Sequence, residues 1–249
     1  MRQIEKILQE ISAEEKLNYQ SFADGWILRV GEKFVSGYQF AVNNAAASRL
    51  CDDKSATYEC LKDAEIAAIP HYFFMEMDKA RLAQIRSANG DLVLKPNNST
   101  GGEDVVRASS IEEVFSEAGK ILSKSDFLAV SPYYSFENEY RLIVLNGEVQ
   151  ICYRKKIQSG WKHNLGLGAQ ATIIEPDEKL ADLALKTAAA LNICFASVDI
   201  AECASEGLKV LEVNSGVMME YFSEQSDENY QIAKEIYRKA VKIMETQDC

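Results

Sequence analysis

The 249-residue chain lacks the residues and motifs that mark several common kinds of functional site. It has only two histidines, His71 and His163, which argues against a histidine-rich zinc site. Its six cysteines show no CxxC spacing, and a GxxxxGK(S/T) phosphate loop is absent. No apolar run near the N-terminus is long enough for a signal peptide or a membrane span. These absences predict a cytoplasmic protein with reduced thiols.

Positive charge is also scarce in this sequence. Lys and Arg number 27 against 38 Asp and Glu, which gives a formal net charge of -11. This surplus of acid argues against a nucleic-acid backbone or an anionic membrane as the main partner, although a local basic patch could still bind a small polyphosphate. The composition is that of a globular protein, with 47% hydrophobic residues, and the length predicts one domain of two lobes or two small domains.

Two short predicted strands, SVDIAE and LKVLEVN, place polar side chains among apolar neighbours. Because side chains alternate between the faces of a strand, Glu212 and Asn214 point the same way. A hairpin turn between the strands would put Asp199 directly opposite Glu212. Like charges that face each other cost up to about 1 kcal/mol. A divalent cation between the two carboxylates would make their proximity favourable. Two carboxylates and an amide oxygen are ligands that Mg²⁺ accepts. A polar strand face in solvent is the alternative.

A second polar segment, KPNNSTGGEDVV, follows a predicted strand that ends at Pro96. It combines Lys95 with two adjacent glycines, Gly101 and Gly102, which let backbone N–H groups approach phosphate oxygens closely. Taken alone, the segment fits a flexible β-hairpin turn better than a phosphate site.

A hairpin with the turn Asn146-Gly147 is predicted in EYRLIVLNGEVQICYR. A tight turn pairs Glu139 with Arg154 and places Arg141 on the same face of the sheet. This charged face is predicted either to be solvated or to line a site.

Helices and antiparallel strands are predicted in alternating blocks, which favours an α+β fold over a doubly wound parallel sheet. Helices are predicted at residues 1–11, 44–64 with a break near 51–53, about 78 onward, 110–122, 176–191 and 229–245. Strands are predicted at residues 26–30, 33–40, 71–75, 91–96 and 127–134. At the break, Asp52 or Asp53 is the candidate N-cap of the helix that follows.

Taken in order, DDKSATYECL, LVLKPNNSTGGEDVV, ENEYRLIVLNGEV, RKK with KHNLGLGA, SVDIAE and VLEVN resemble the ATP-grasp superfamily, and within it the RimK-like carboxylate–amine ligases. The resemblance covers residues 43–217. It implies two α+β lobes with Mg-ATP between them. The implied division is a truncated N-terminal segment at 1–48, a small lobe at 49–127 and a C-terminal lobe with the metal site at 128–249. The short first segment implies a substrate pocket that is reduced or completed by a partner chain.

The resemblance also implies a role for each residue of the site. Among the nucleotide-binding residues, Lys54 and Lys95 would contact the phosphates, and a flap with Ser99, Thr100, Gly101 and Gly102 would close over them. The backbone of the segment 129–133, which includes Val130, Ser131 and Tyr133, would contact adenine. Glu139 would lie near the ribose hydroxyls, and Arg141 and Lys155 would line the same site. The residues that act on the reacting groups would be Arg154, Lys162 and Asn164. The ligands of Mg²⁺, or of Mn²⁺ in its place, would be Asp199, Glu212 and Asn214. An exposed ion pair is the alternative for Glu139 with Arg154, and surface charge is the alternative for Lys155.

The activity that the resemblance implies is ATP-dependent joining of a carboxylate to an amine through an acylphosphate, on an amino acid or peptide, with release of ADP and phosphate. Alternatives are an enzyme that joins side chains within a peptide precursor, a kinase-like member and a nucleotide-binding module without turnover. Ser197 stands where D-alanine ligase relatives carry arginine, which argues against a D-alanyl-D-alanine ligase. Expected partners are ATP and the substrates, without nucleic acid or membrane, and a homo-oligomer is left open.

Overall fold

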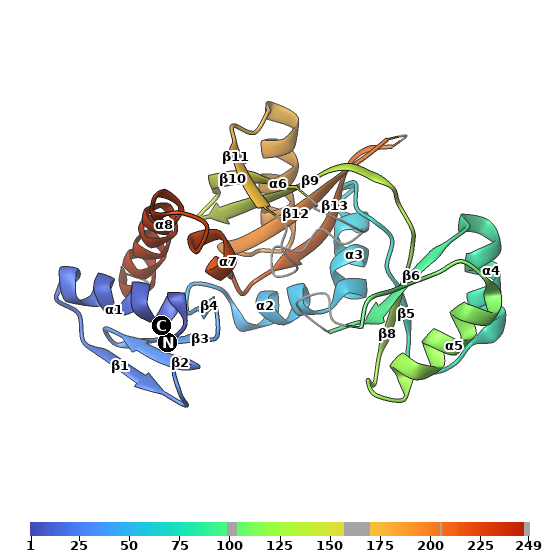
Figure 1. Ribbon diagram of the computed structural model, residues 1–249, viewed down its shortest axis with the longest axis horizontal. Coiled ribbons are helices and arrows are strands. Elements are labelled where there is room, and N and C mark those ends of the chain that lie inside the picture. The colour runs from blue at the N-terminus through green and yellow to red at the C-terminus, as the bar shows by residue number, and fades with distance from the viewer. Residues whose placement is uncertain (99–103, 157–169, 205, 247–249) are drawn as a thin grey trace.

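The computed structural model (Figure 1) describes residues 1–98, 104–156, 170–204 and 206–246. This part of the chain forms helices and three antiparallel sheets, which confirms the predicted α+β class. None of the helices in these ranges is long and apolar enough to cross a membrane. The predicted division of the chain at residues 48 and 127 stays a prediction.

The N-terminal unit, residues 3–40, is a helix followed by a sheet in which each strand pairs with the next. Its elements are α1 (Gln3–Glu15), β1 (Tyr19–Phe22), β2 (Ile27–Val30), β3 (Lys33–Ser36) and β4 (Gln39–Phe40). The side chains that predicted the helix share one buried face, and these are Ile4, Ile7, Leu8 and Ile11. The N-terminal unit therefore contributes to a hydrophobic core.

Helix α1 packs against the last helix, α8 (Asp227–Thr246), in one hydrophobic cluster (Figure 1). Charged pairs border this contact. Lys234 of α8 lies 2.7 Å from Glu10 and 2.8 Å from Glu14 of α1. Arg238 lies 2.7 Å from Glu14 and 3.1 Å from Glu15. Segments more than 200 residues apart in the sequence are thus joined (Lys234 and Glu10 are separated by 224 positions).

A five-stranded sheet, here called the large sheet, forms the centre of the molecule. In spatial order its strands are β11 (Gln170–Ile174), β10 (Glu148–Lys156), β9 (Phe136–Leu145), β12 (Phe195–Cys203) and β13 (Gly207–Asn214). Helix α6 (Glu178–Ala190) covers one face in a second hydrophobic cluster. On the other face, Ile143 and Phe195 pack against the N-terminal unit and α8. The rest of that face carries polar side chains.

A four-stranded sheet, the small sheet, lies at the other end of the molecule (Figure 1). In spatial order its strands are β5 (Tyr72–Phe74), β8 (Leu128–Pro132), β6 (Leu92–Pro96) and β7 (Val106–Ala108). Helices α4 (Lys79–Asn89) and α5 (Ile111–Leu122) pack on it in a third cluster. The predicted capping box of α5 is confirmed, because Ser110 Oγ accepts from Glu113 N at 3.1 Å and the Glu113 carboxylate accepts from Ser110 N at 3.2 Å.

The predicted break near residues 51–53 separates two helices, α2 (Ala45–Asp52) and α3 (Lys54–Asp63). Asp53 is the N-cap of α3, because its Oδ1 accepts from Ala56 N at 2.8 Å. Asp52 instead ends α2 and does not act as this cap. Both helices contribute to the cluster that includes α6 and the large sheet.

The predicted pairing of the β9–β10 hairpin is wrong beyond its turn. A β-bulge between Val149 and Ile151 shifts the register by one residue. Lys155 therefore lies opposite Glu139, and Arg154 lies opposite Tyr140. A one-residue shift moves every later side chain to the other face of the sheet.

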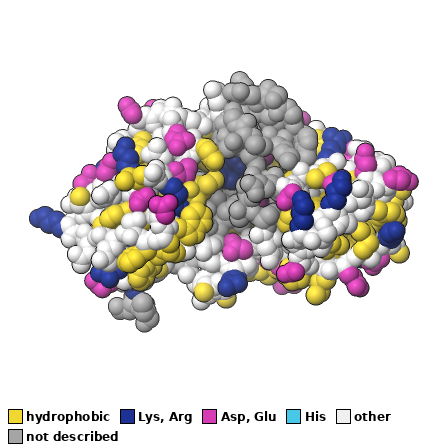
Figure 2. Space-filling view, turned by 60° about the horizontal axis from the view of Figure 1, so that its bottom comes forward, with side chains coloured by type: hydrophobic (Ala, Val, Ile, Leu, Met, Phe, Trp, Pro, Cys, Tyr) yellow, Lys and Arg dark blue, Asp and Glu magenta, His cyan; other side chains and the backbone are white. Residues whose placement is uncertain are grey.

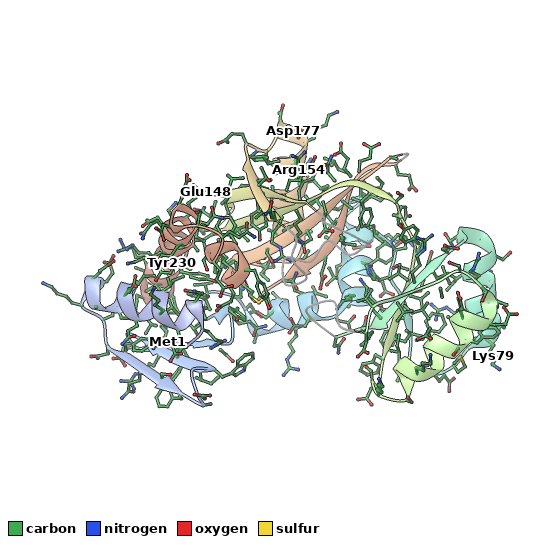
Figure 3. All side chains as sticks on the ribbon, viewed as in Figure 1. Met1, Lys79, Glu148, Arg154, Asp177 and Tyr230 are labelled. Atoms are coloured by element: carbon green, nitrogen blue, oxygen red, sulfur yellow. The ribbon has the colours of Figure 1, made fainter. Side chains whose placement is uncertain are left out.

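Arg154 is consequently not on the polar face with Glu139 and Arg141. It is exposed on the side of the large sheet that α6 covers, near Asp177 at the start of that helix (Figure 3). Its predicted action on the reacting groups therefore has no support from its position.

Candidate functional site

The open face of the large sheet brings together most of the predicted polar residues of the C-terminal half. Paired residues on neighbouring strands share a face, so they form rows across the sheet. One row is Tyr153, Arg141, Asp199 and Glu212, and beside it lie the pairs Lys155 with Glu139 and Ser197 with Asn214. The predicted position of Asp199 opposite Glu212 is confirmed.

Four charged groups lie at the centre of this face, of which Glu139, Lys155 and Asp199 are buried and Arg141 is partly exposed. Arg141 donates from Nε and Nη2 to the two carboxylate oxygens of Asp199, both at 2.6 Å. Lys155 Nζ lies 2.5 Å from Glu139 Oε1 and 3.0 Å from Asp199 Oδ2. Two cations thus balance two carboxylates, which is the condition under which charges can be buried at tolerable cost.

The pKa values follow this arrangement. Burial alone would raise the pKa of Asp199, but Arg141 and Lys155 outweigh burial and lower it to about 2. Burial raises the pKa of the Glu139 carboxyl despite its contact with Lys155. Burial would lower the pKa of the Lys155 ammonium, and Asp199 and Glu139 raise it above its usual value. Asp199 is therefore the carboxylate held most firmly in the charged form.

We expect Lys155→Met to lower the free energy of unfolding by about 3–5 kcal/mol, because it leaves Glu139 buried without its cation. Arg154→Met is the matched control, since Arg154 is the exposed neighbour on the same strand and should change stability by less than about 1 kcal/mol. Urea unfolding of both variants measures the difference. Equal stability losses would contradict the observed register.

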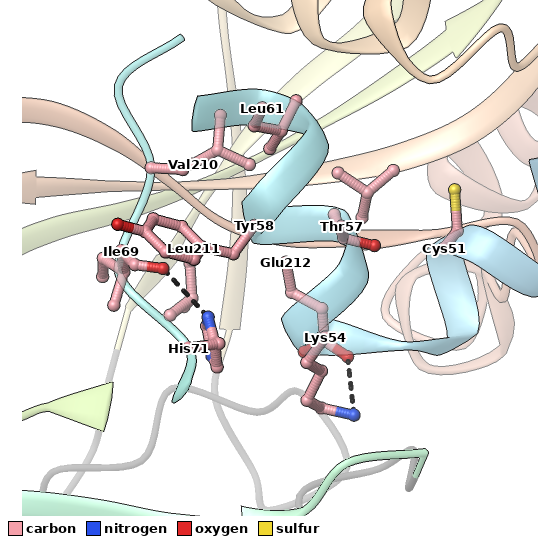
Figure 4. Close-up of a pocket in the computed structure, with 12 residues that line it drawn as sticks. Cys51, Lys54, Thr57, Tyr58, Leu61, Ile69, His71, Val210, Leu211 and Glu212 are labelled. Carbon is pink, nitrogen blue, oxygen red and sulfur yellow. Dashed lines mark hydrogen bonds and ion pairs between the residues drawn. The ribbon is translucent and has the colours of Figure 1, made fainter. Parts of the chain in front are cut away.

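Two predicted lysines approach this face from other elements. Lys54 begins α3, and its Nζ lies 3.8 Å from Glu212 Oε1 (Figure 4). Lys95 lies in β6 of the small sheet and is 7% exposed. Burial is the main cause that lowers the pKa of Lys95 to about 8; Glu212 opposes this shift, and the nearby charge of Lys54 adds to it. The structure thus concentrates positive charge beside the row that ends at Glu212.

Asn97 and His71 are site residues that the sequence did not reveal. Asn97 Oδ1 accepts from Ser55 N at 3.1 Å and from Ser55 Oγ at 2.9 Å, and Asn97 O accepts from Lys54 Nζ at 3.3 Å. Asn97 therefore fixes the end of β6 to the start of α3. His71 lines the same pocket as Lys54 and Glu212 (Figure 4), and burial lowers its pKa well below its usual value, so the ring is neutral.

The predicted adenine segment lies in β8, a central strand of the small sheet. The backbone of Val130 pairs with Tyr72 on one side and Leu94 on the other, and Ser131 pairs with Val93. Backbone groups of a central strand are used by its ladders. Tyr133 follows the strand, and the Arg107 guanidinium lies 3.7 Å from its ring centroid. The ladder to β5 ends at Val130, so on that edge backbone that could contact a base begins at Ser131, whereas Tyr133 N already donates to Asp91 O at 2.8 Å.

The donor set of Asp199, Glu212 and Asn214 fits a hard divalent cation such as Mg²⁺ or Mn²⁺, since all its donors are oxygens on one face of the β12–β13 hairpin. Arg141 and Lys155 already balance the charge of Asp199. Within the described ranges, no group of three His, Cys, Asp or Glu residues could hold a metal ion. A divalent cation bound beside Asp199 and Glu212 would therefore need the amide oxygen of Asn214 and oxygens of a bound phosphate as further ligands.

Other predicted residues lie outside the described residues, and these are Ser99, Thr100, Gly101, Gly102, Lys162 and Asn164. In the space-filling view, Lys and Arg side chains are interspersed with Asp and Glu side chains over the surface at both ends of the molecule (Figure 2).

The sequence of this chain is similar to those of known ATP-grasp proteins. Residues 51–239 match the sequence family described as the RimK-like ATP-grasp domain. A tetrahydromethanopterin:alpha-L-glutamate ligase of Methanocaldococcus jannaschii is 31% identical over 63% of this chain and 55% of its own length. A glutamate–LysW ligase, ArgX, of Sulfurisphaera tokodaii is 29% identical over 70% of this chain and 63% of its own. The chain thus spans only part of the length of these curated relatives.

The ATP-grasp ligase PsnB, solved with a minimal precursor, Mg and ADP, superimposes with a TM-score of 0.64 at 13% identity. The match covers 95% of this chain and 94% of PsnB. This likeness confirms the predicted ATP-grasp fold.

Proposed function

Because this chain belongs to the RimK-like ATP-grasp family, we propose that it uses Mg-ATP to join a carboxylate to an amine. The substrate carboxylate attacks the γ-phosphorus, ADP leaves, and an acylphosphate forms. The amine then attacks the acyl carbon, and phosphate leaves as the amide forms. The released ammonium proton passes to water. Such chemistry requires positioning and charge neutralisation by the protein rather than a covalent enzyme intermediate.

The observation that best supports this proposal is that Lys54 of α3 lies 3.8 Å from Glu212 of the large sheet, while Asn97 holds the end of β6, the strand that carries Lys95, against the start of α3. Two cations on one side and oxygen donors on the other suit a polyphosphate with its metal ion. When bound, Mg²⁺ would neutralise phosphate charge. Lys54 and Lys95 would hold phosphate oxygens against the row of donors.

The four central charges would serve the site indirectly. Arg141 fixes both oxygens of Asp199, so the carboxylate keeps one orientation beside Glu212. Lys155 and Glu139 complete the charge balance. Because both side chains are buried, Glu139 is better placed to support Lys155 than to contact a ribose directly. The flap, with Ser99, Thr100, Gly101 and Gly102, and the roles of Lys162 and Asn164 stay predictions.

The substrate class we propose is an amino acid or short peptide. Both curated relatives are named as ligases of glutamate, which makes glutamate the first amino acid to test. A cytoplasmic location, a homo-oligomer and the absence of nucleic-acid and membrane partners stay predictions.

The test is phosphate release from Mg-ATP with pooled amino acids and short peptides, run with and without hydroxylamine as a substitute nucleophile. An activated carboxylate is expected to give both phosphate and a hydroxamate, which mass spectrometry identifies. Glu212→Ala is the inactive control. Phosphorylated product without any amide or hydroxamate would contradict a ligase and favour a kinase. Mg-ATP binding without turnover on any pool would favour a larger peptide substrate or a non-catalytic module.

A further inference from the structure

His71 immediately precedes β5, and its ring is turned toward the large sheet rather than toward the helices of the small sheet. The residues before Lys95 in β6 and before Ser131 in β8 belong to the cluster with α4 and α5. Because side chains alternate along a strand, Lys95 and Ser131 lie on the opposite face. His71 lines a pocket with Lys54 and Glu212 (Figure 4), which places its ring on this opposite face as well.

The two ring nitrogens of His71 have different surroundings. Nδ1 lies 2.9 Å from Ile69 O, and because a carbonyl oxygen only accepts, Nδ1 carries the proton. Burial and the nearby charges of Lys95 and Lys54 lower the pKa of the ring, so Nε2 presents a lone pair. Among the described residues, Nε2 has no hydrogen-bond partner although it is buried. A buried acceptor without a donor is unfavourable, so the pocket is suited to a ligand that donates a hydrogen bond to Nε2.

The donor cannot be a phosphate group, because ionised phosphate oxygens only accept hydrogen bonds. Within ATP, the donors are the exocyclic amine of adenine and the hydroxyls of the ribose. The surroundings of His71 favour the base. Ile69, which accepts from His71 Nδ1, belongs to an apolar cluster with Tyr134, Phe136 and Leu211. Aliphatic and aromatic side chains of this kind suit the flat face of a purine better than a hydrated sugar.

We propose that His71 Nε2 accepts a hydrogen bond from the exocyclic amine of adenine and thereby selects ATP over purine nucleotides that carry oxygen in place of that amine. This inference rests on the proposed ligase function. The pairing of Tyr72 with Val130 brings His71 beside Ser131, where the ladder between β5 and β8 has ended. A base at this edge meets free backbone and the His71 ring together. An oxygen in place of the amine sets two acceptors against each other and leaves the buried nitrogen unpaired.

The experiment measures kcat/KM for ATP and for inosine triphosphate in the hydroxamate assay with the active substrate pool. The wild type is expected to prefer ATP, and His71→Leu should reduce the ratio of the two values by about tenfold or more, as loss of one buried hydrogen bond would. Thr57→Val is the matched control. It lines the same pocket and loses a hydrogen bond from Oγ1 to Leu50 O, so it should lower the unfolding midpoint and leave the ratio unchanged.

Two deoxynucleotides test the ribose as the alternative donor. His71→Leu should leave the ratio of ATP to 2′-deoxy-ATP and to 3′-deoxy-ATP within about twofold of the wild type, because the base contact does not involve the sugar. A fall in one of these ratios instead of the inosine ratio would overturn the base assignment. An inosine ratio that is unchanged in His71→Leu, or that falls equally in Thr57→Val, would overturn it as well.

Binding of the nucleoside diphosphates provides a readout that does not need turnover. The amide of a glutamine can rotate to donate as well as accept. His71→Gln should therefore bind inosine diphosphate better, relative to ADP, than the wild type does, and calorimetric titration measures both affinities. Equal discrimination in the variant and the wild type would contradict the role of His71. Absence of hydroxamate from a wild type that still discriminates the two diphosphates would overturn the ligase function and leave the base contact in place.

Discussion

Glu212→Gln is expected to reduce turnover by about a thousandfold, because it removes a charge from the proposed metal site while keeping the size of the side chain. Glu212 faces Asp199 across the hairpin and lies 3.8 Å from Lys54 Nζ. Arg141 and Lys155 balance Asp199 at 2.6 and 3.0 Å, whereas the cation beside Glu212 is at the longer distance of 3.8 Å, so Glu212 is the carboxylate of the set that is less closely paired. Phosphate release with the active substrate pool measures the effect.

Two further measurements separate loss of metal from loss of structure. Calorimetric titration with ADP should show Mg²⁺-dependent binding in the wild type, and the variant should lose that dependence. Glu206→Gln removes a carboxylate from the exposed end of the same hairpin and should keep full activity. Normal turnover in Glu212→Gln would exclude Glu212 as a metal ligand.

Lys95→Met is expected to lower kcat/KM for ATP by at least about a hundredfold, because it removes a buried cation from the proposed phosphate site. The ammonium of Lys95 is desolvated, so the variant should be at least as stable as the wild type. A thermal unfolding midpoint that does not fall would therefore show that the loss is functional. Lys120→Met, at an exposed position of α5, is the matched control.

The pH dependence of the wild type supplies a second readout for Lys95. Its pKa of about 8 means that the ammonium is present below that pH and is lost above it. We expect kcat/KM for ATP to fall as pH rises through about 8, because kcat/KM reports the free enzyme. Lys95→Arg keeps its charge throughout this range and should abolish the decline. A profile that is unchanged in Lys95→Arg would assign the decline to another group.

The lowered pKa of Lys95 also determines whether this residue makes the folded protein more or less stable as the pH rises. The unfolded chain holds the Lys95 proton up to about pH 10.4, whereas the folded chain loses it near 8. Between these values the unfolded state binds more protons, so the contribution of Lys95 to stability rises with pH. Stability and ATP binding are therefore expected to change in opposite directions over this interval.

Local sequence pattern was sufficient to predict some of the elements and one pairing of the candidate site. Alternation along the strands placed Asp199 opposite Glu212, and the apolar spacing of residues 4–11 located α1. The register beside the turn, where Cys203 lies opposite Gly207, would not by itself place Asp199 opposite Glu212. A bulge between Asp199 and Ile200 shifts the register by one residue and restores that pairing.

In the β9–β10 hairpin a single bulge had no such compensation, and Arg154 was assigned to the wrong face. No signal in the sequence marks that bulge, because the residues around it are as suited to a regular strand as to an irregular one. The position of His71 in one pocket with Lys54 and Glu212 was equally out of reach, since it depends on how distant elements pack. The periodicity of a sequence predicts each helix or strand separately and carries no information about which distant elements pack against it.

The contact between α1 and α8 also constrains how the chain can fold during synthesis. Leu8 and Ile11 belong to one hydrophobic cluster with strand residues of the N-terminal unit and with α8, whose residues follow more than 200 positions later. Until α8 leaves the ribosome, the apolar face of α1 lacks part of its final cover and is exposed to incorrect association. Contacts this distant in sequence also slow folding, because the chain must close a long loop before it gains them. The N-terminal unit is therefore made before α8 but completes its packing only when α8 is present, so incorrect association of α1 is a risk during the interval between them.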